Sequence, residues 1–188
     1  MIFTVLSYFD NIIGPKIFLQ FPNVNSHINL DYIPLIMDLY DQGFFIHECN
    51  DLKTANLIFD IKDPLARGRI NRLMISIILI EKEYALNLNS FKEIMEFLAH
   101  KLKNKEDLYK GFYCEAIPEA IDYYNDIKDF MYSFHQSLNT YKQNMSKSSI
   151  YSLSPTGKNN IIRSLQERIA HPKQQIGAIP ITRNYKIL

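Results

Sequence analysis

The chain has 188 residues, of which 21 are basic and 20 acidic, and 47% are apolar. This apolar fraction is enough for a buried core and excludes global disorder, and the length predicts one domain with an extension. The balanced charge argues against nucleic-acid binding and against attachment to an anionic membrane by charge alone.

The cysteines and the apolar runs indicate the compartment. Cys49 and Cys114 lack CxxC spacing, so we expect two reduced thiols, with a disulfide or metal role as the alternative. The N-terminus has no basic region and is interrupted by Asp10, and the apolar run 73–80 is far shorter than the roughly 20 residues of a membrane span. We therefore expect a cytoplasmic protein without a transmembrane segment.

The first 22 residues predict a β-hairpin around a break at 11–15. Residues 2–9 are rich in strand formers, and residues 16–21 alternate, which places Ile17, Leu19 and Phe21 on one face. Gly14 allows a positive φ and Pro15 fixes φ, so both are expected to be structural turn residues.

Further elements follow in chain order. Asp31 as N-cap and Gly43 as terminator predict a helix between them, with Ile33, Ile36, Met37 and Tyr40 on one stripe. Strands are predicted at 44–49, 54–62 and 72–80. The second strand should place Leu57, Phe59 and Ile61 on one face, and the third is apolar enough to be covered on both faces.

Two helices and a tail complete the chain. Asn89 or Ser90 is expected to cap the first helix, which the charged residues 103–110 could extend until Gly111 breaks it. The second is a long amphipathic helix at 117–143 that begins near Pro118. Residues 144–188 are predicted to be a flexible tail with a short helix at 160–170, which could fold back on its own domain or dock on a partner.

The hairpin carries a resemblance to a known family. The sequence Phe9-Asp10-Asn11-Ile12-Ile13-Gly14-Pro15-Lys16-Ile17 resembles the opening of longin-type domains, especially those of nitrogen-permease-regulator-like subunits, and more loosely that of DENN proteins. The element order β-β-α-β-β-β-α-α over 1–143 resembles the same family. The Ala66-Arg67-Gly68 turn also resembles longin- and roadblock-like proteins of archaea related to eukaryotes.

The resemblance implies a fold and a function. The fold is α+β, with a five-stranded antiparallel sheet, one helix on one face and two on the other. The function is that of a non-enzymatic interaction module in membrane trafficking or signalling. Such a module forms a homo- or heterodimer with longin or roadblock domains, and binds or regulates a small Ras-like GTPase. It can associate peripherally with a membrane.

No catalytic, cofactor or metal site is recognisable. The sequence Ser154-Pro155-Thr156-Gly157-Lys158-Asn159 lacks the first Gly and the Ser or Thr of a phosphate loop. His47 and Cys49 share one face of their strand without Glu48, so fewer than three ligands converge there, and we interpret His47 as a surface histidine. Asp10 has no catalytic partner and is expected to close its turn through hydrogen bonds to the backbone.

The candidate contact residues lie in three places. Asp10 and Lys16 flank the first turn, and Arg67, Arg69 and Arg72 form a basic cluster that is either solvated or contacts an acidic partner or membrane phosphate. The long helix is expected to pack on the core, and its exposed part, with Tyr123, Phe130 and Tyr132, could also form a dimer face. The strand 44–49 is an alternative contact if it lies at a sheet edge. Two other functions stay open: a scaffold subunit without GTPase contact, and a small enzyme with an unrecognised site.

Overall fold

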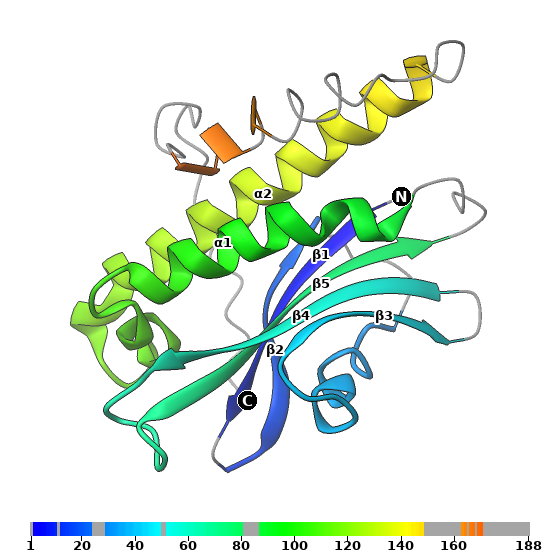
Figure 1. Cartoon of the computed structure of the whole chain (residues 1–188). Helices are drawn as coiled ribbons and strands as arrows, with labels where there is room; N and C mark the ends of the chain where they lie inside the picture. The colour runs from blue at the N-terminus through cyan, green and yellow to red at the C-terminus, as the bar shows by residue number, and fades with distance from the viewer. Residues whose placement is uncertain are drawn as a thin grey trace.

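Five antiparallel strands form one sheet in the computed structural model of the chain (Figure 1). The structure describes residues 2–10, 12–23, 29–49, 52–80 and 87–148, and in the C-terminal part residues 163, 164, 166, 167, 169 and 170. The strands are β1 (Ile2–Asp10), β2 (Gly14–Phe21), β3 (Gly43–Cys49), β4 (Leu52–Lys62) and β5 (Ile70–Ile80), in the spatial order β2-β1-β5-β4-β3. The expected α+β fold with a five-stranded antiparallel sheet is confirmed.

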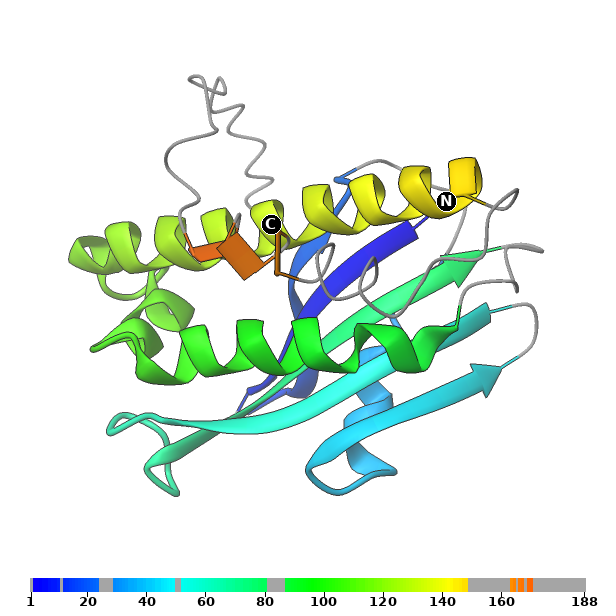
Figure 2. The ribbon, with the colours of Figure 1, turned by 45° about the horizontal axis from the view of Figure 1, so that its top comes forward.

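The two long helices cover one face of the sheet. The helices α1 (Lys92–Asn104) and α2 (Ile121–Ser148) lie side by side on this face, and the 3-10 helix η1 (Pro34–Asp38) lies on the other (Figure 2). Three further 3-10 helices precede the long ones: η2 (Leu88–Phe91), η3 (Leu108–Tyr113) and η4 (Pro118–Ala120). Each face therefore has its own apolar cluster, and the larger one lies under α1 and α2.

The central strand β5 contributes to both clusters. Leu73, Ile75, Ile77 and Leu79 face the long helices, whereas Met74 and Ile78 face η1. This agrees with the expectation of a strand covered on both faces. The predicted alternation of the fourth strand is also confirmed, because Leu57, Phe59 and Ile61 all belong to the larger cluster.

The predicted alternation of β2 is wrong, because a β-bulge interrupts it. Leu6 pairs with Leu19 and Ser7 pairs with Ile17, so Phe18 is an extra residue in β2. An extra residue reverses the inward and outward sides beyond it. Ile17 therefore packs with the η1 cluster, whereas Phe18 and Phe21 pack with Leu19 against the larger cluster.

The helix predicted between Asp31 and Gly43 is shorter and tighter than expected. Only 34–38 is helical, and the side-chain oxygen of Asn29 accepts from the Asp31 N–H at 2.8 Å. The backbone bonds span three residues, as from Ile36 N to Ile33 O at 3.2 Å. A 3-10 helix stacks every third side chain, which suits the buried residues Leu30, Ile33 and Ile36.

The helical boundaries differ from the predicted ones. Asn87 caps η2 through its side chain, and α1 then begins at Lys92. The helix ends at Asn104 because Lys105 is extended (ψ 118°), so the charged residues up to 110 do not prolong it. Gly111 does not end a helix but lies within η3. The long helix runs to Ser148, five residues beyond the predicted end at 143.

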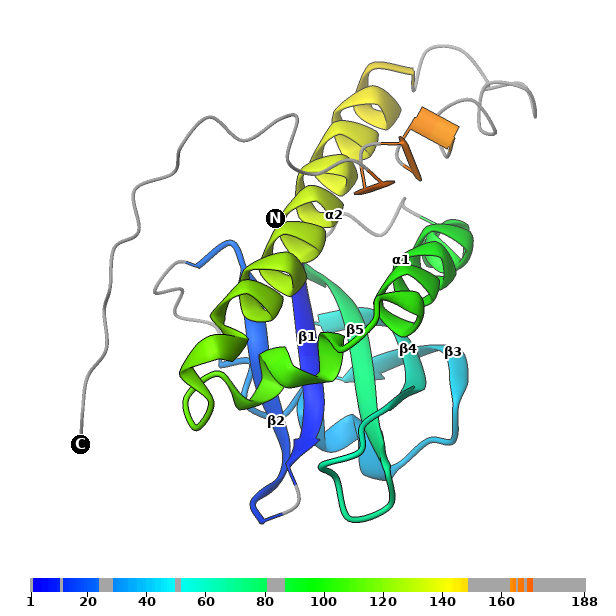
Figure 3. The ribbon, with the colours of Figure 1, turned by 90° about the vertical axis from the view of Figure 1, so that its left-hand side faces the viewer.

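The C-terminal part returns to the domain. Its described residues between 163 and 170 are helical and lie over α1 and α2, on the side away from the sheet (Figure 3). Ile169 is fully buried and belongs to the larger apolar cluster. The other residues from 149 onwards, including the 154–159 motif, lie outside the described part of the chain.

Candidate functional site

Two turns meet at one end of the sheet. The turn between β1 and β2 and the loop between β4 and β5 extend side by side in Figures 1 and 3. The antiparallel pairing of β1 with β5, which ends with Tyr8 opposite Leu73, brings them together. The structure thus places Asp10 and Lys16 at the same end as Arg67, Arg69 and Arg72.

Asp10 closes the first turn. Its Oδ1 accepts hydrogen bonds from the backbone N–H groups of Ile12 at 2.9 Å and Ile13 at 3.1 Å. Its Oδ2 lies 3.0 Å from Lys16 Nζ. The hydrogen bond from Ile12, followed by the one from Lys16, lowers the pKa of Asp10 to about 2. Gly14 follows with φ +90°.

Asp63 holds the second loop, which sequence reasoning did not foresee. Its Oδ1 accepts from the backbone N–H groups of Leu65 at 3.0 Å and Ala66 at 3.2 Å. Its Oδ2 accepts from the Tyr113 hydroxyl at 2.8 Å and the Asn71 amide at 3.3 Å. Burial and the hydrogen bond to Asp63 raise the pKa of Tyr113. The available signal was the Asp-Pro pair at the end of a strand-like run, the same chemistry as Asp10.

The two turns present exposed aliphatic side chains. Ile12 is 95% exposed and Ile13 72%, and from the second loop Leu65 is 55% and Ile70 53% exposed. Arg67 and Arg69 are exposed beside them, and neither pairs with an acidic side chain of the described residues. The tip surface, as we name it, comprises Ile12, Ile13, Leu65, Arg67, Arg69 and Ile70.

The other two cations of this end are already paired. Lys16 Nζ lies beside Asp10 and 5.0 Å from the centre of the Tyr8 ring. Arg72 Nε lies 3.4 Å from Asp60 Oδ1. Lys16 and Arg72 therefore stabilise the base of the two turns through ion pairs. Among the described residues, the exposed Arg67 and Arg69 have no acidic partner.

A second exposed surface lies at the sheet edge formed by β3. The Tyr40 ring stacks on Phe45 of β3 with the centroids 3.9 Å apart, and its hydroxyl lies 3.2 Å from His47 Nδ1. Leu35 and Leu39 of the adjoining η1 region are 55% and 69% exposed. In the same segment of the chain, Asp38 and Asp41 are exposed. The β3-edge surface is defined as Leu35, Leu39, Tyr40, Phe45 and His47.

The expected dimer face on α2 is half-buried by its own domain. Lys110 Nζ lies 5.5 Å from the centre of the Tyr123 ring. Phe130 packs against the larger apolar cluster. The structure does not bring these two side chains together with the tip surface, and each has a packing role within the chain.

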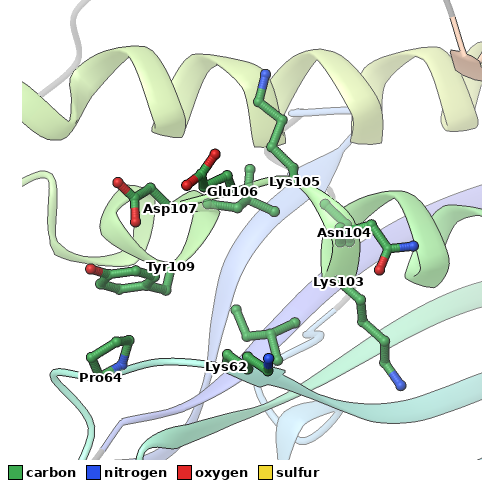
Figure 4. A pocket seen from close by; sticks show the side chains of 11 residues that line it. Lys62, Pro64, Lys103, Asn104, Lys105, Glu106, Asp107 and Tyr109 are labelled. Atoms are coloured by element: carbon green, nitrogen blue, oxygen red, sulfur yellow. The ribbon is translucent and has the colours of Figure 1, made fainter.

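A shallow pocket of about 250 Å³ lies near the C-terminal end of α1 (Figure 4). It is lined by Ile61, Lys62, Pro64 and residues 102–109. Lys105 pairs with Asp126 at 2.7 Å, and Asp107 pairs with Lys110. The volume falls below the roughly 300 Å³ at which small-molecule sites begin. Because Lys105 and Asp107 are engaged with neighbouring side chains, we assign no catalytic role to the pocket.

The described ranges contain neither a metal-binding cluster nor a membrane-spanning helix. Within them no three His, Cys, Asp or Glu side chains gather closely enough to hold a metal ion. His47 is half-buried and lies next to Tyr40. Of the helices that the structure describes, none combines the length and apolarity that a membrane crossing requires.

The comparisons with known proteins include a likeness to a solved structure. No protein-family model matches the chain, and no curated protein matches it. Among solved structures it is similar to the K. lactis Lst4 longin domain, with 12% identity and a TM-score of 0.31. The alignment covers 93% of this chain and 96% of that domain. A likeness of this strength carries no functional argument.

Proposed function

We propose that the protein is a non-enzymatic interaction module that docks a longin or roadblock domain, as a homo- or heterodimer, and binds a small Ras-like GTPase. The observation that carries the proposal is the β3-edge surface. An edge strand offers unpaired backbone donors and acceptors, and an extended segment of a partner can add to it as a further strand. The exposed side chains of Leu35, Leu39 and Tyr40 lie beside that edge.

The composition of this surface favours a protein partner. Aromatic and aliphatic side chains in its centre and carboxylates around it match the anatomy of protein interfaces, with an apolar core and a polar rim. The stacking of Tyr40 on Phe45 holds the Tyr40 ring in place without a partner, which lowers the entropic cost of binding. The acidic rim favours a partner that presents basic groups.

The proposal predicts that charge on the β3-edge surface prevents docking. We expect Leu35→Lys with Leu39→Lys to weaken partner binding by at least about tenfold, because the two ammonium groups would lose hydration in the interface and repel the basic groups of the partner. Both side chains are exposed, so the fold should stay intact. Light scattering gives the dimer mass, and pull-down with purified small GTPases loaded with GDP or a GTP analogue gives the binding.

Ile12→Ser with Ile13→Ser is the matched control, since it changes two exposed aliphatic residues at the tip. This control should retain the dimer and the GTPase. If a tight dimer retains no GTPase in either nucleotide state, the scaffold function replaces the proposed one. Turnover of a substrate by the purified protein would establish the enzyme alternative, whereas a change in GTP hydrolysis or exchange on the GTPase would support regulation.

A further inference from the structure

The tip surface differs in chemistry from the β3-edge surface. Its apolar members are aliphatic side chains at the ends of two turns, and its exposed charges are two arginines. Apolar groups surrounded by cations complement a bilayer that contains anionic lipids, where hydrocarbon lies beneath a layer of negative charge. The rim of the β3-edge surface is acidic, so the two surfaces suit different partners.

The aliphatic side chains are held outward by the turns themselves. The backbone N–H groups of Ile12 and Ile13 donate to Asp10, and that of Leu65 donates to Asp63. These bonds fix the backbone at the residues that carry the exposed side chains. A backbone already satisfied by its own carboxylates can approach an interface without losing hydrogen bonds.

The local charges favour the same partner. Asp10 pairs with Lys16 and Asp60 with Arg72, while Asp63 is buried and accepts hydrogen bonds within its loop. Two of these carboxylates are thus paired with cations and the third is buried, so the exposed charges of the tip surface are those of Arg67 and Arg69. Two cations alone give weak membrane attraction, as the balanced net charge already implied, so the aliphatic side chains must contribute the rest.

The shape of the tip favours a bilayer over a protein. The two turns protrude beside each other beyond the sheet (Figures 1 and 3), and side chains at protruding turns can enter a fluid interface at once. A protein partner would need a matching hollow for each of them. We propose that the tip surface inserts Ile12, Ile13, Leu65 and Ile70 into the headgroup region of an anionic bilayer, with Arg67 and Arg69 contacting lipid phosphates. This proposal does not depend on the dimer or the GTPase.

Because the chain has no tryptophan, a single introduced one can report the contact. We would prepare the full chain with Ile12→Trp and, as the matched control, with Leu39→Trp from the β3-edge surface. Each is titrated with vesicles of phosphatidylcholine alone or of phosphatidylcholine mixed with phosphatidylserine. The expected result is a blue shift and quenching by brominated lipid for Ile12→Trp with the anionic vesicles only. The same response from both variants, or none from Ile12→Trp, would overturn the proposal.

Vesicle co-sedimentation of variants separates the apolar and the ionic contributions to membrane binding. Ile12→Ser with Ile13→Ser should reduce binding by at least about tenfold, since two aliphatic side chains no longer leave water. Arg67→Gln with Arg69→Gln should reduce it by roughly thirtyfold at low salt, and Lys128→Gln, an exposed cation on α2, should not change it. Circular dichroism confirms that each variant is folded. If the wild-type chain does not sediment with anionic vesicles while the tip variants lose a protein in pull-down, the tip is a protein contact.

Discussion

Asp10 and Asp63 have the same structural role in two neighbouring turns. Each comes at the end of a strand, and each accepts two backbone N–H groups from the residues two and three positions later. An Asp side chain at such a position replaces the ladder hydrogen bonds that end with the strand. The residues after each Asp can then project aliphatic side chains without leaving backbone groups unpaired.

Gly14 provides the conformation that the first turn needs. Its φ is +90°, and a Cβ placed there would meet no atom within 4 Å, so backbone strain alone decides the effect of a substitution. We predict that Gly14→Val lowers the free energy of unfolding by about 1–3 kcal/mol, because a β-branched residue rarely adopts a positive φ. The measurement is urea denaturation.

Gly68→Ala serves as the comparison for this substitution. Gly68 has no positive φ, and a Cβ added at this residue would have Ile70 Cγ1 as its nearest neighbour, at 3.7 Å. Its stability should change by less than about 0.5 kcal/mol. Equal stability of Gly14→Val and the wild-type protein would mean that the turn tolerates another conformation.

At the scale of the elements, local chemistry and periodicity predicted the five strands, because each strand has enough β-branched and aromatic residues to bury at least one face. They did not predict the bulge at Phe18. The sequence 16–21 alternates regularly, and the extra residue shows only in the pairing of Leu6 with Leu19 and of Ser7 with Ile17. The bulge turns Phe18 toward Tyr8 and Phe112, with ring centroids 5.6 and 4.5 Å away. These rings belong to other segments of the chain, so the sequence of the strand alone could not predict the bulge.

The same limit explains Asp63 and η1. The buried position of Asp63 depends on Tyr113, which is 50 residues away in the chain. For residues 30–38, a spacing of three and a spacing of three to four both bury the same side chains, so periodicity could not distinguish a 3-10 helix from an α-helix. For the candidate site, Asp10 and the Ala66-Arg67-Gly68 turn were enough to single out the two turns as contact regions. The exposure of their aliphatic residues could not be predicted from the sequence.

Gly111 allows η3 to pack closely against α2. A Cβ at this position would lie 2.8 Å from the backbone N of Tyr124 and 2.9 Å from the backbone C of Tyr123. We predict that Gly111→Ala costs about 1–3 kcal/mol of stability, because two backbone segments must move apart. Thermal unfolding followed by circular dichroism measures this.

Ala116→Gly is a suitable control for Gly111→Ala, since Ala116 is exposed in the turn that follows η3. It should change stability by less than about 1 kcal/mol. A melting temperature of Gly111→Ala equal to that of the wild-type chain would show that η3 can shift away from α2 freely.

The molecule as a whole has one sheet packed on both faces, with the β3-edge surface and the tip surface at different places on it. The long helices cover one face of the sheet, and η1 packs on the other. One edge carries the β3-edge surface and one end carries the tip surface. The two proposed contacts, with a protein and with a bilayer, are compatible with each other, because the two surfaces share no residue.

The extent of the folded unit depends on Ile169. The predicted domain ends at 143, yet Ile169 is fully buried and belongs to the larger apolar cluster. If this contact stabilises the domain, Ile169→Ala should lower the free energy of unfolding by about 2–4 kcal/mol, the usual cost of deleting a buried aliphatic side chain. Glu167→Ala removes a neighbour that is 68% exposed, together with its ion pair to Arg163, and should cost less than about 1 kcal/mol.

Limited proteolysis adds a second measurement, in which Ile169→Ala should make the chain around residue 169 cleavable at a protease concentration that leaves the same region of the wild-type chain intact. Unchanged stability and unchanged cleavage would place the end of the folded unit at α2.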